Sequence, residues 1–354
     1  MAIINIYIKR EKMTPTQRVL KAIEEIKKGN MVIMVDDEDR ENEGDLVYAA
    51  AFSTPAHVNF MATHARGLIC VALSRGIANR LELNPMVSSN TSSYETAFTV
   101  SVDAKDALTG ISAKERDDTI NILANPISKP DELVKPGHIF PLIAKEGGTL
   151  VRTGHTEGSV DLCRLAGLSE AGVICEIIKD NGEMARRDDL DIFAGEHNLH
   201  TVFISDIVEY RLANERLVQE VAVEEIEFFG VKVTRHTFED HDGIKHNAIL
   251  FYSAGEIANV RVHNVIPDAE LLLNQDKYNN LIQSIEYLKQ NSGLLVFINK
   301  THHQDNSAPK EFGIGAQIIK SFGISKMNLI TSLKATDFVG LSGFGLEVNE
   351  VVDL

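Results

Sequence analysis

Seven carboxylates and one arginine lie within ten consecutive residues, Asp36–Asp45, near the N-terminus of this 354-residue chain. Apolar runs flank this acidic stretch, Met31–Val35 before it and Leu46–Phe52 after it, and such short runs are typical of buried strands. Acidic loops are often only solvated turns. Here, however, an arginine lies inside the cluster, and the flanking runs hold the loop against the domain. Because a hard cation such as magnesium needs one or two carboxylates, the stretch predicts a metal or phosphosugar site.

A second polar stretch, Arg152–Glu157, precedes an apparent helix, Glu157–Ala166. Arginine, glycine and threonine at a helix N-terminus suit a phosphate monoester, because they offer a fork of donors, close backbone approach and the positive end of the helix dipole. His155 in this turn is placed to reach a metal held by the acidic stretch. Each feature is weak alone, and together they predict a site.

Two further residues suit proton transfer. His138 lies in Pro136–Pro141, which predicts a rigid turn framed by two prolines, and an imidazole there is a usable acid–base group. Glu176 lies among apolar residues of a predicted strand, Gly172–Ile178. Burial without a partner makes a carboxylate a proton carrier near neutral pH. The alternative is that Glu176 points outward from an edge strand.

Two other segments leave alternatives open. Thr109–Glu115 contains a capping box, Ser112 with Glu115, and its hydroxyls suit either a helix cap or a bound phosphate. The Ser- and Thr-rich segment Asn90–Val100 is either a half-exposed strand or a loop that covers a substrate.

The elements around these motifs alternate between helices and short strands. Helices are predicted from Thr14 and from Thr54 to about Ala65, and helices at Asp188–Asn198 and Asp206–Leu217 close the first half. We therefore expect a mixed α/β first domain, with helices packed on a twisted mixed sheet.

After about residue 217 the pattern changes to short strand-like segments within Val231–Val265. A helix at about Asp268–Gln290, a strand at Leu294–Asn299 and a helix at Gly313–Ile324 follow. This pattern predicts a smaller α+β second domain.

Composition narrows the class of protein. The net charge of −16 argues against a nucleic-acid partner, because phosphate contacts need clustered lysine and arginine. Three scattered cysteines, Cys70, Cys163 and Cys175, suit a reducing compartment and offer no disulfide framework. No apolar run approaches the roughly 20 residues of a membrane span, so we expect a cytoplasmic protein. Residues 1–13 are interpreted as a possible N-terminal extension.

The first-half motifs resemble 3,4-dihydroxy-2-butanone 4-phosphate synthase. The resemblance rests on Asp36–Asp45, Gly137–Pro141, Gly154–Glu157 and Cys175-Glu176, and covers roughly residues 14–212. It implies an enzyme that converts ribulose 5-phosphate to the four-carbon unit of riboflavin and expels the fourth carbon as formate. It also implies a homodimer.

The resemblance further implies a role for individual residues. Glu41 and His155 would hold a pair of Mg²⁺ (or Mn²⁺) ions, and His138 and Glu176 would be catalytic. An enediolate formed beside a ketone is stabilised by divalent ions, and the proton transfers that follow need groups that titrate near neutral pH. The substrate-binding residues implied are Arg40, Glu41, Asp45, Arg152, Thr153, Gly154, His155, Thr156 and Glu176.

The second half resembles GTP cyclohydrolase II, most closely at Phe312–Ile324 and Val339–Val348. That family holds zinc with three cysteines after a Val-His-Ser-like segment, whereas Val262-His263-Asn264 is followed by Val265–Asn280, which has no cysteine. Without zinc no water is activated to open the purine ring.

The family's Glu-Gly-Arg-Gly loop is replaced by Lys300–Pro309, whose His302 and His303 are poorly placed to hold one ion together. We therefore expect no zinc and a catalytically inactive domain at residues 218–354, behind a synthase domain at residues 14–217. Two alternatives are a bifunctional enzyme that still hydrolyses GTP, and a protein that senses or scaffolds a phosphosugar.

Overall fold

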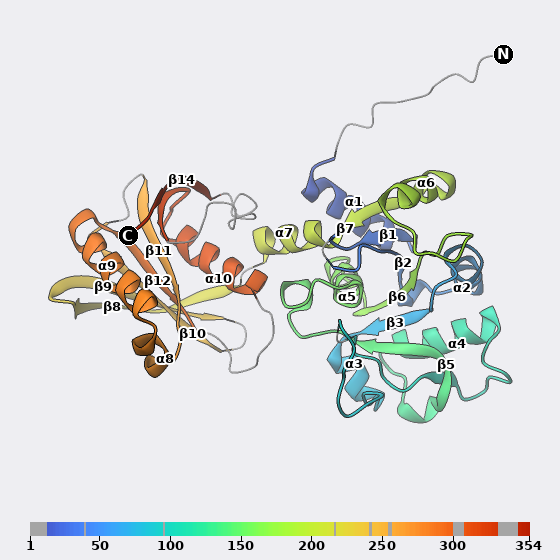
Figure 1. The fold of residues 1–354 in the computed structure, drawn as a ribbon. Coiled ribbons are helices and arrows are strands. Elements are labelled where there is room, and N and C mark those ends of the chain that lie inside the picture. The colour runs from blue at the N-terminus through green and yellow to red at the C-terminus, as the bar shows by residue number, and fades with distance from the viewer. Residues whose placement is uncertain are drawn as a thin grey trace, which may run out of the picture. The chain divides into compact units, whose positions relative to one another are not determined.

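The computed structural model describes residues 13–38, 40–94, 96–215, 217–240, 243–253, 257–299, 308–331 and 346–354. These residues form two compact units, divided between Tyr210 and Arg211 (Figure 1). No helix in these ranges is long and apolar enough to cross a membrane. The N-terminal extension up to residue 12, and the histidines His302 and His303, lie outside the described residues.

The first unit is built on a sheet whose described strands run in the order β4-β5-β3-β6-β2-β1-β7. Strands β1 and β7 and strands β3 and β5 pair parallel, and the other neighbours pair antiparallel. The expected mixed α/β fold is therefore confirmed. The strand bounds are β1 Val32–Val35, β2 Gly44–Ala49, β3 Cys70–Leu73, β4 Val102–Ala104, β5 Leu133–Ile143, β6 Ala171–Glu176 and β7 His200–Phe203.

Helices cover both faces of this sheet, and each face has its own apolar core. One core joins the sheet to α1, α5 and α7, and the other joins it to α2, α3, α4 and α6. The helix bounds are α1 Pro15–Lys27, α2 Pro55–Phe60, α3 Arg75–Arg80, α4 Ala113–Ala124, α5 His155–Leu165, α6 Arg187–His197 and α7 Ile204–Asn214.

Helix α1 begins where its capping residues predict. Thr14 accepts a hydrogen bond from Gln17 N at 3.3 Å, and the Gln17 side chain accepts one from Thr14 N at 2.9 Å. The helix then buries Val19, Ile23 and Ile26 on one face. The predicted start of the helix is confirmed.

Two predicted elements end earlier than expected. The strand expected at Leu46–Phe52 stops at Ala49, and residues 50–52 form a 3₁₀ turn (Ala50–Phe52). The helix expected to reach Ala65 leaves the α conformation after Phe60 and widens into a π turn, Met61–Ala65. That turn ends at Arg66, whose left-handed backbone (φ 70°) donates to the Met61 carbonyl.

The prediction of a turn at His138 is wrong, because His138 lies within strand β5. The β4–β5 register jumps, since Val102 pairs with Ile139 while Asp103 pairs with Val134. The residues between these pairs on β5 form a bulge. The two prolines therefore coincide with a bulge inside a continuous strand, not with a turn.

Two open alternatives are settled by the topology. Glu176 ends β6, which lies between β3 and β2, so the edge-strand alternative is wrong. Of the described residues in Asn90–Val100, only Phe98 and Thr99 form isolated bridges, so this segment is a loop rather than a strand.

The second unit is also built on a mixed sheet, with described strands in the order β14-β13-β11-β12-β10-β9-β8. Its helix α9 packs on one face of the sheet, and α10 lies against the other through Gly315 and Val262. The strand bounds are β8 Val218–Phe228, β9 Val231–Asp240, β10 Lys245–Phe251, β11 Ala258–Asn264, β12 Gly293–Ile298, β13 Lys326–Ile330 and β14 Glu347–Val352, and the helix bounds are α8 Asp268–Leu273, α9 Gln275–Asn291 and α10 Ala308–Ser321.

The expected α+β class of this unit is confirmed, with two corrections. The single helix predicted at Asp268–Gln290 is broken at Asn274, whose side chain accepts from Lys277 N at 3.1 Å and caps α9. Strand β8 was not predicted, because most of its residues are exposed and it shows no apolar alternation.

Candidate active site

Polar side chains lie near the ends of neighbouring strands in the sheet of the first unit. Asp45 on β2 pairs directly with Glu176 on β6. Cys70 on β3 pairs with Ile174 on β6 and with Phe140 on β5, and two residues earlier Leu68 N donates to the Glu176 carboxylate at 2.8 Å. His138 lies on β5, which β3 separates from β6.

These three polar residues share one face of the sheet. Side chains alternate along a strand, so Asp45, Glu176 and His138 lie on the same face as Cys70 and Phe140. This is the face of the apolar core that includes α5. The N-terminal turn of α5, which carries His155, therefore meets the row of carboxylates.

Asp36 organises the acidic stretch. It is 2% exposed and accepts hydrogen bonds from the backbone N–H groups of Glu41 at 3.1 Å and Glu43 at 2.8 Å. Nη1 of Arg40 lies 2.8 Å from Asp36 Oδ2 and 2.7 Å from Glu41 Oε2, so it bridges the two carboxylates. The loop is therefore folded around one buried carboxylate, which disagrees with the alternative of a solvated turn.

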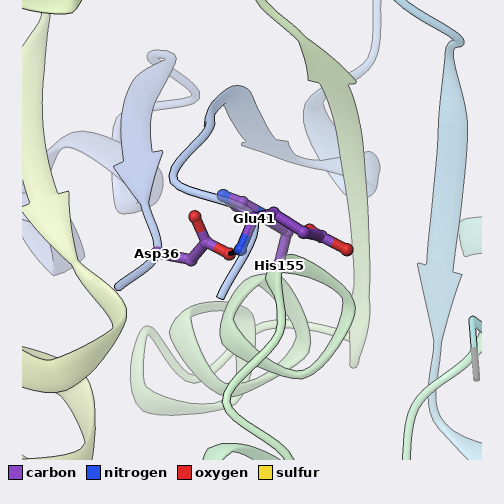
Figure 2. Close-up of side chains that lie close together, drawn as sticks. All are labelled: Asp36, Glu41 and His155. Carbon is purple, nitrogen blue, oxygen red and sulfur yellow. Dashed lines mark hydrogen bonds and ion pairs between the residues drawn. The ribbon is translucent and has the colours of Figure 1, made fainter. Parts of the chain in front are cut away.

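Asp36, Glu41 and His155 converge on one point (Figure 2). Ligand atoms from the three residues all lie within 4.8 Å of one another. His155 Nε2 lies 3.2 Å from the Met34 carbonyl, which can only accept, so Nε2 carries the proton. Nδ1 lies 3.8 Å from Glu41 Oε2 and faces the acidic cluster, where it would bind a cation only after giving up its proton.

The electrostatics of this cluster favour an added positive charge. Burial raises the pKa of Asp45 to about 8, against the opposing effect of His155 and with help from Glu176 and Glu41. Asp45 is 3% exposed, and its Oδ1 has no hydrogen-bond partner among the described residues. A divalent cation would offset both the crowding of carboxylates and this unpaired oxygen.

The pKa of His155 is raised, whereas the pKa of Glu41 is lowered. Burial alone would lower the pKa of His155, but Asp45, Glu41 and Asp36 together raise it to about 9. Burial alone would raise the pKa of Glu41, but His155 and Arg40 outweigh it and lower the pKa to about 2. Glu41 is therefore a carboxylate at any pH near neutral, as a metal ligand must be.

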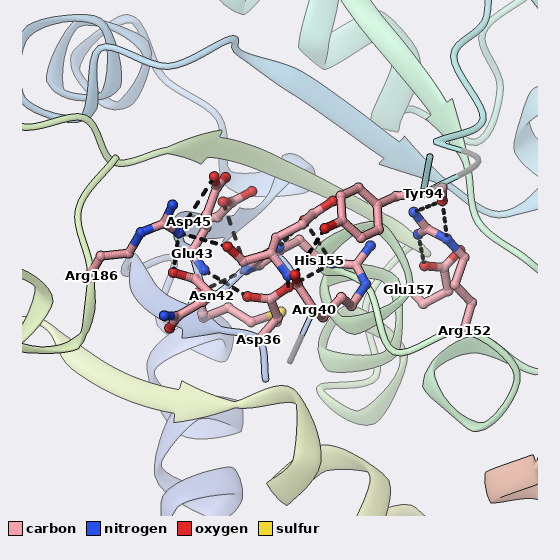
Figure 3. A network of polar contacts seen from close by, with 12 residues as sticks. Asp36, Arg40, Asn42, Glu43, Asp45, Tyr94, Arg152, His155, Glu157 and Arg186 are labelled. Carbon is pink, nitrogen blue, oxygen red and sulfur yellow. Dashed lines mark hydrogen bonds and ion pairs between the residues drawn. The ribbon is translucent and has the colours of Figure 1, made fainter. Parts of the chain in front are cut away.

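Tyr94 and Arg152 bring the Asn90–Val100 loop onto the site (Figure 3). The Tyr94 hydroxyl donates to the Arg40 carbonyl at 3.0 Å, and the Arg40 guanidinium lies over the Tyr94 ring at 5.2 Å. Arg152 donates to the Tyr94 carbonyl at 2.9 Å and to Glu157 at 2.5 Å. This geometry agrees with the substrate-covering alternative for the loop.

The predicted phosphate-suited turn lies beside the same cluster. Helix α5 begins at His155, two residues earlier than predicted, and Gly154 is its N-cap without a side-chain cap bond. Thr156 is 5% exposed and Thr153 is half-buried. The structure therefore brings Arg152–Thr156 together with Arg40, Glu41 and Asp45.

Thr109–Glu115 serves as a helix cap. The Glu115 carboxylate accepts from Leu108 N, Thr109 N, Thr109 Oγ1 and Ser112 Oγ. A carboxylate thus occupies these donors in the structure, which agrees with the helix-cap alternative for this segment.

Several residues that contact the predicted set were not singled out from the sequence. Arg186 donates to the carbonyls of Glu41 at 2.7 Å and Asn42 at 2.5 Å and lies 3.7 Å from Glu43 Oε1. Asp103 contacts His138, and its only signal in the sequence is that it is a single aspartate within an apolar, strand-like run. Asp36, Tyr94 and Glu157 lie within predicted segments, but none of them was predicted from the sequence to have a role of its own.

Comparison with known proteins agrees with this geometry. The 3,4-dihydroxy-2-butanone 4-phosphate synthase family matches residues 20–210. A 3,4-dihydroxy-2-butanone 4-phosphate synthase of Sulfurospirillum multivorans is 60% identical over 331 residues, which cover 94% of this chain and 93% of the relative. The chain belongs to the 3,4-dihydroxy-2-butanone 4-phosphate synthase family. It is a formate-releasing lyase of riboflavin biosynthesis.

Solved structures of synthases match one or both units. The two-domain synthase RibBX from A. baumannii has a TM-score of 0.78 and 41% identity, and the match covers 95% of this chain and 99% of that one. A synthase in complex with two magnesium ions has a TM-score of 0.54 and 38% identity, with 56% of this chain and 97% of that one covered. The GTP cyclohydrolase II family matches only residues 300–353, so the second unit is a partial member at most.

Proposed function

We propose that this synthase converts D-ribulose 5-phosphate with the help of two divalent cations, magnesium or manganese, held by Glu41 and His155. The observation that carries the proposal is the convergence of Asp36, Glu41 and His155 on one point. The related synthase solved with two magnesium ions supports this choice of metal. Asp45, with its unpaired buried oxygen, lies at the same cluster and fits contact with the substrate or its hydrated metal.

The chain's own residues would bind and orient the phosphosugar. Arg152, Thr153, Gly154 and Thr156 at the start of α5 offer donors for the phosphate end, as free N–H groups at a helix N-terminus do. Arg40 and Asp45 then face the sugar hydroxyls. When bound, the cations stabilise the negative charge that enolisation places on neighbouring substrate oxygens.

Proton transfer is assigned to His138 on β5 and Glu176 on β6, two strands that β3 separates. Glu176 accepts from Leu68 N at 2.8 Å, which holds its carboxylate at the edge of the cluster. Gly67 has no room for a Cβ beside Glu176, so the chain approaches this carboxylate closely.

The test is formate release from ribulose 5-phosphate by the full chain after removal of metal with a chelator. We expect no release by the metal-free protein and recovery on adding magnesium or manganese. Formate release that is equally fast with and without a chelator would overturn the metal assignment. Absence of release under every metal condition would overturn the function itself.

For the second half we propose a domain at residues 218–354 that does not open GTP and binds no zinc, behind a synthase domain at residues 14–217. The missing cysteines after Val262-His263-Asn264 support this, as does the short family match at residues 300–353. Incubation of the zinc-supplemented full chain with GTP should leave the nucleotide unchanged. Consumption of GTP would instead favour the bifunctional enzyme.

We also propose a cytoplasmic homodimer. The family resemblance supports the dimer, and the three buried unpaired cysteines suit a reducing compartment. Light scattering should give twice the 39.1 kDa mass of one chain.

A further inference from the structure

Asp103 on β4 holds His138 on β5 by two contacts from one carboxylate. Oδ1 accepts from His138 N at 2.8 Å, and Oδ2 lies 2.8 Å from His138 Nδ1. Asp103 is 7% exposed, whereas the side chain of His138 is 46% exposed. One end of the imidazole is thus anchored to a buried group, and the rest of the ring faces the open side of the sheet.

The anchor fixes the position of the ring proton. A carboxylate only accepts hydrogen bonds, so the contact with Oδ2 requires the proton on Nδ1. In the neutral ring Nε2 is then the unprotonated nitrogen. It is the atom available to take a proton from a substrate and return it later.

The surroundings make the pair rigid. Ala104 N, next along β4, donates to Thr119 Oγ1 of α4 at 2.8 Å, and Thr119 is fully buried. Gly110, with φ +76°, closes over the pair so tightly that a Cβ there would overlap Asp103 Oδ2 and His138 Nδ1. The bulge in β5 brings His138 N to the carboxylate. Three separate elements therefore hold this geometry.

We propose that Asp103 is a positioning residue of the synthase, which orients the His138 ring and keeps Nε2 unprotonated toward the substrate. This inference rests on the proposed catalytic role of His138. The simpler alternative is that Asp103 only stabilises the bulge of β5, and the two differ in which quantities change when the carboxylate is removed.

The first measurement is steady-state kinetics of Asp103→Asn in the full chain with magnesium. The amide has one acceptor oxygen and an NH₂ group, so it cannot receive both His138 donors, and it favours the tautomer with the proton on Nε2. Replacing the orienting carboxylate of a Ser-His-Asp triad by an amide costs about 10⁴-fold in kcat. We expect kcat to fall about 10²–10⁴-fold, the range of one acid–base group, with little change in KM.

A double-mutant cycle with His138→Gln shows whether Asp103 acts through His138. Once the imidazole is gone, Asp103→Asn should lower formate release no further, because groups that act as a unit are not additive. Asp106→Asn is the matched control, since Asp106 is an exposed aspartate three residues along, and it should keep wild-type kcat.

Nitrogen NMR of the imidazole supplies a readout that a purely structural role would not change. In the wild-type chain the signals should show Nδ1 protonated and Nε2 unprotonated, and in Asp103→Asn the Nε2-protonated form should appear. Wild-type kcat in Asp103→Asn, or an unchanged tautomer, would overturn the inference. So would an additive loss in the double mutant.

The outcomes separate this inference from the function beneath it. No formate release by the wild-type chain would refute the synthase activity. Full activity of His138→Gln would refute the role of His138. A severe defect in His138→Gln together with normal turnover in Asp103→Asn would refute only the positioning role of Asp103.

Discussion

Single side chains decide the character of the acidic stretch. Asp36 is buried and uses both carboxylate oxygens to bind the backbone of the loop, so it cannot move toward a ligand without unfolding the turn. Glu41 is different, because its carboxylate contacts only side chains, those of Arg40 and His155. Glu41 therefore has more freedom to bind a cation than Asp36 does.

Substitution of Glu41 should separate catalysis from folding. Glu41→Gln keeps the size of the side chain but removes the charge, and loss of even an outer partner of a metal ligand costs about 10–100-fold. We expect formate release to fall by more than about 100-fold, with an unchanged circular dichroism spectrum. Glu38→Gln, at an exposed position of the same loop, should be normal. Normal turnover by Glu41→Gln would show that the metal ligands have been assigned wrongly.

At the scale of elements, the N-terminus of α1 offers a direct test of capping. Thr14→Ala removes the side-chain oxygen that accepts from Gln17 N and leaves the bond from Thr14 N to the Gln17 side chain, and loss of such an N-cap side chain costs about 1 kcal/mol. The free energy of unfolding of the first unit should fall by that amount, so the unit should unfold at a lower denaturant concentration. Thr16→Ala, an exposed change within the same helix, should be neutral or slightly stabilising. Equal stability of Thr14→Ala and wild type would mean that this helix end is frayed in solution.

In the second unit, packing of α9 on β11 predicts a pH-dependent stability. Burial, with smaller contributions from Arg261 and Lys277, lowers the pKa of His263 to about 4. The unfolded chain binds this proton near pH 6.5 and the folded chain only near pH 4. The stabilising contribution is therefore complete above pH 6.5 and is lost as the pH falls toward 4.

Thermal unfolding of the second unit at several pH values checks this expectation. The unfolding temperature of the wild-type chain should fall between pH 6.5 and pH 4, and His263→Gln should show a shallower fall. His57→Gln, a histidine change in the first unit, should leave the slope of the second unit unchanged. A slope that His263→Gln does not alter would assign the pH dependence to other groups.

The elements that could be predicted from sequence are those defined by local chemistry. Caps at Thr14, Thr54 and Ser112 start helices where a side chain accepts a backbone N–H within three residues. Buried strands such as β1, β6 and β12 were predicted from short apolar runs. Strand β8 and the π turn after Phe60 were missed, because solvent exposure and distant pairing determine them rather than local pattern.

The partners within the site could not be predicted for the same reason. Arg186 lies 145 residues from Glu41 along the chain, and Asp103 lies 35 residues from His138. These pairs exist because the register of the sheet and the start of α5 bring separate segments together. Sequence motifs predicted Glu41, His155, His138 and Glu176. The spacing of residues along the chain could not predict the partners that position them.

At the scale of the whole molecule, each unit contains what it needs to fold. The two large apolar cores of the first unit draw on residues between Val19 and Ile207, and the core of the second unit draws on residues between Val233 and Ile330. Every residue proposed for catalysis, metal or substrate lies before the division at Tyr210. The chemistry therefore depends on the first unit alone, unless the second unit supports its assembly.

A chain that ends at Leu217 tests this division of labour. Because both cores of the first unit are complete without the second unit, we expect this shortened chain to fold and to release formate in the presence of magnesium, with a turnover close to that of the full chain. The shortened Glu41→Gln variant is the control and should be inactive. If only the full chain released formate, the second unit would have a structural role in the proposed dimer. Light scattering would then show the shortened chain at the mass of a single copy, whereas a shortened chain that is active and dimeric would make the second unit dispensable for both.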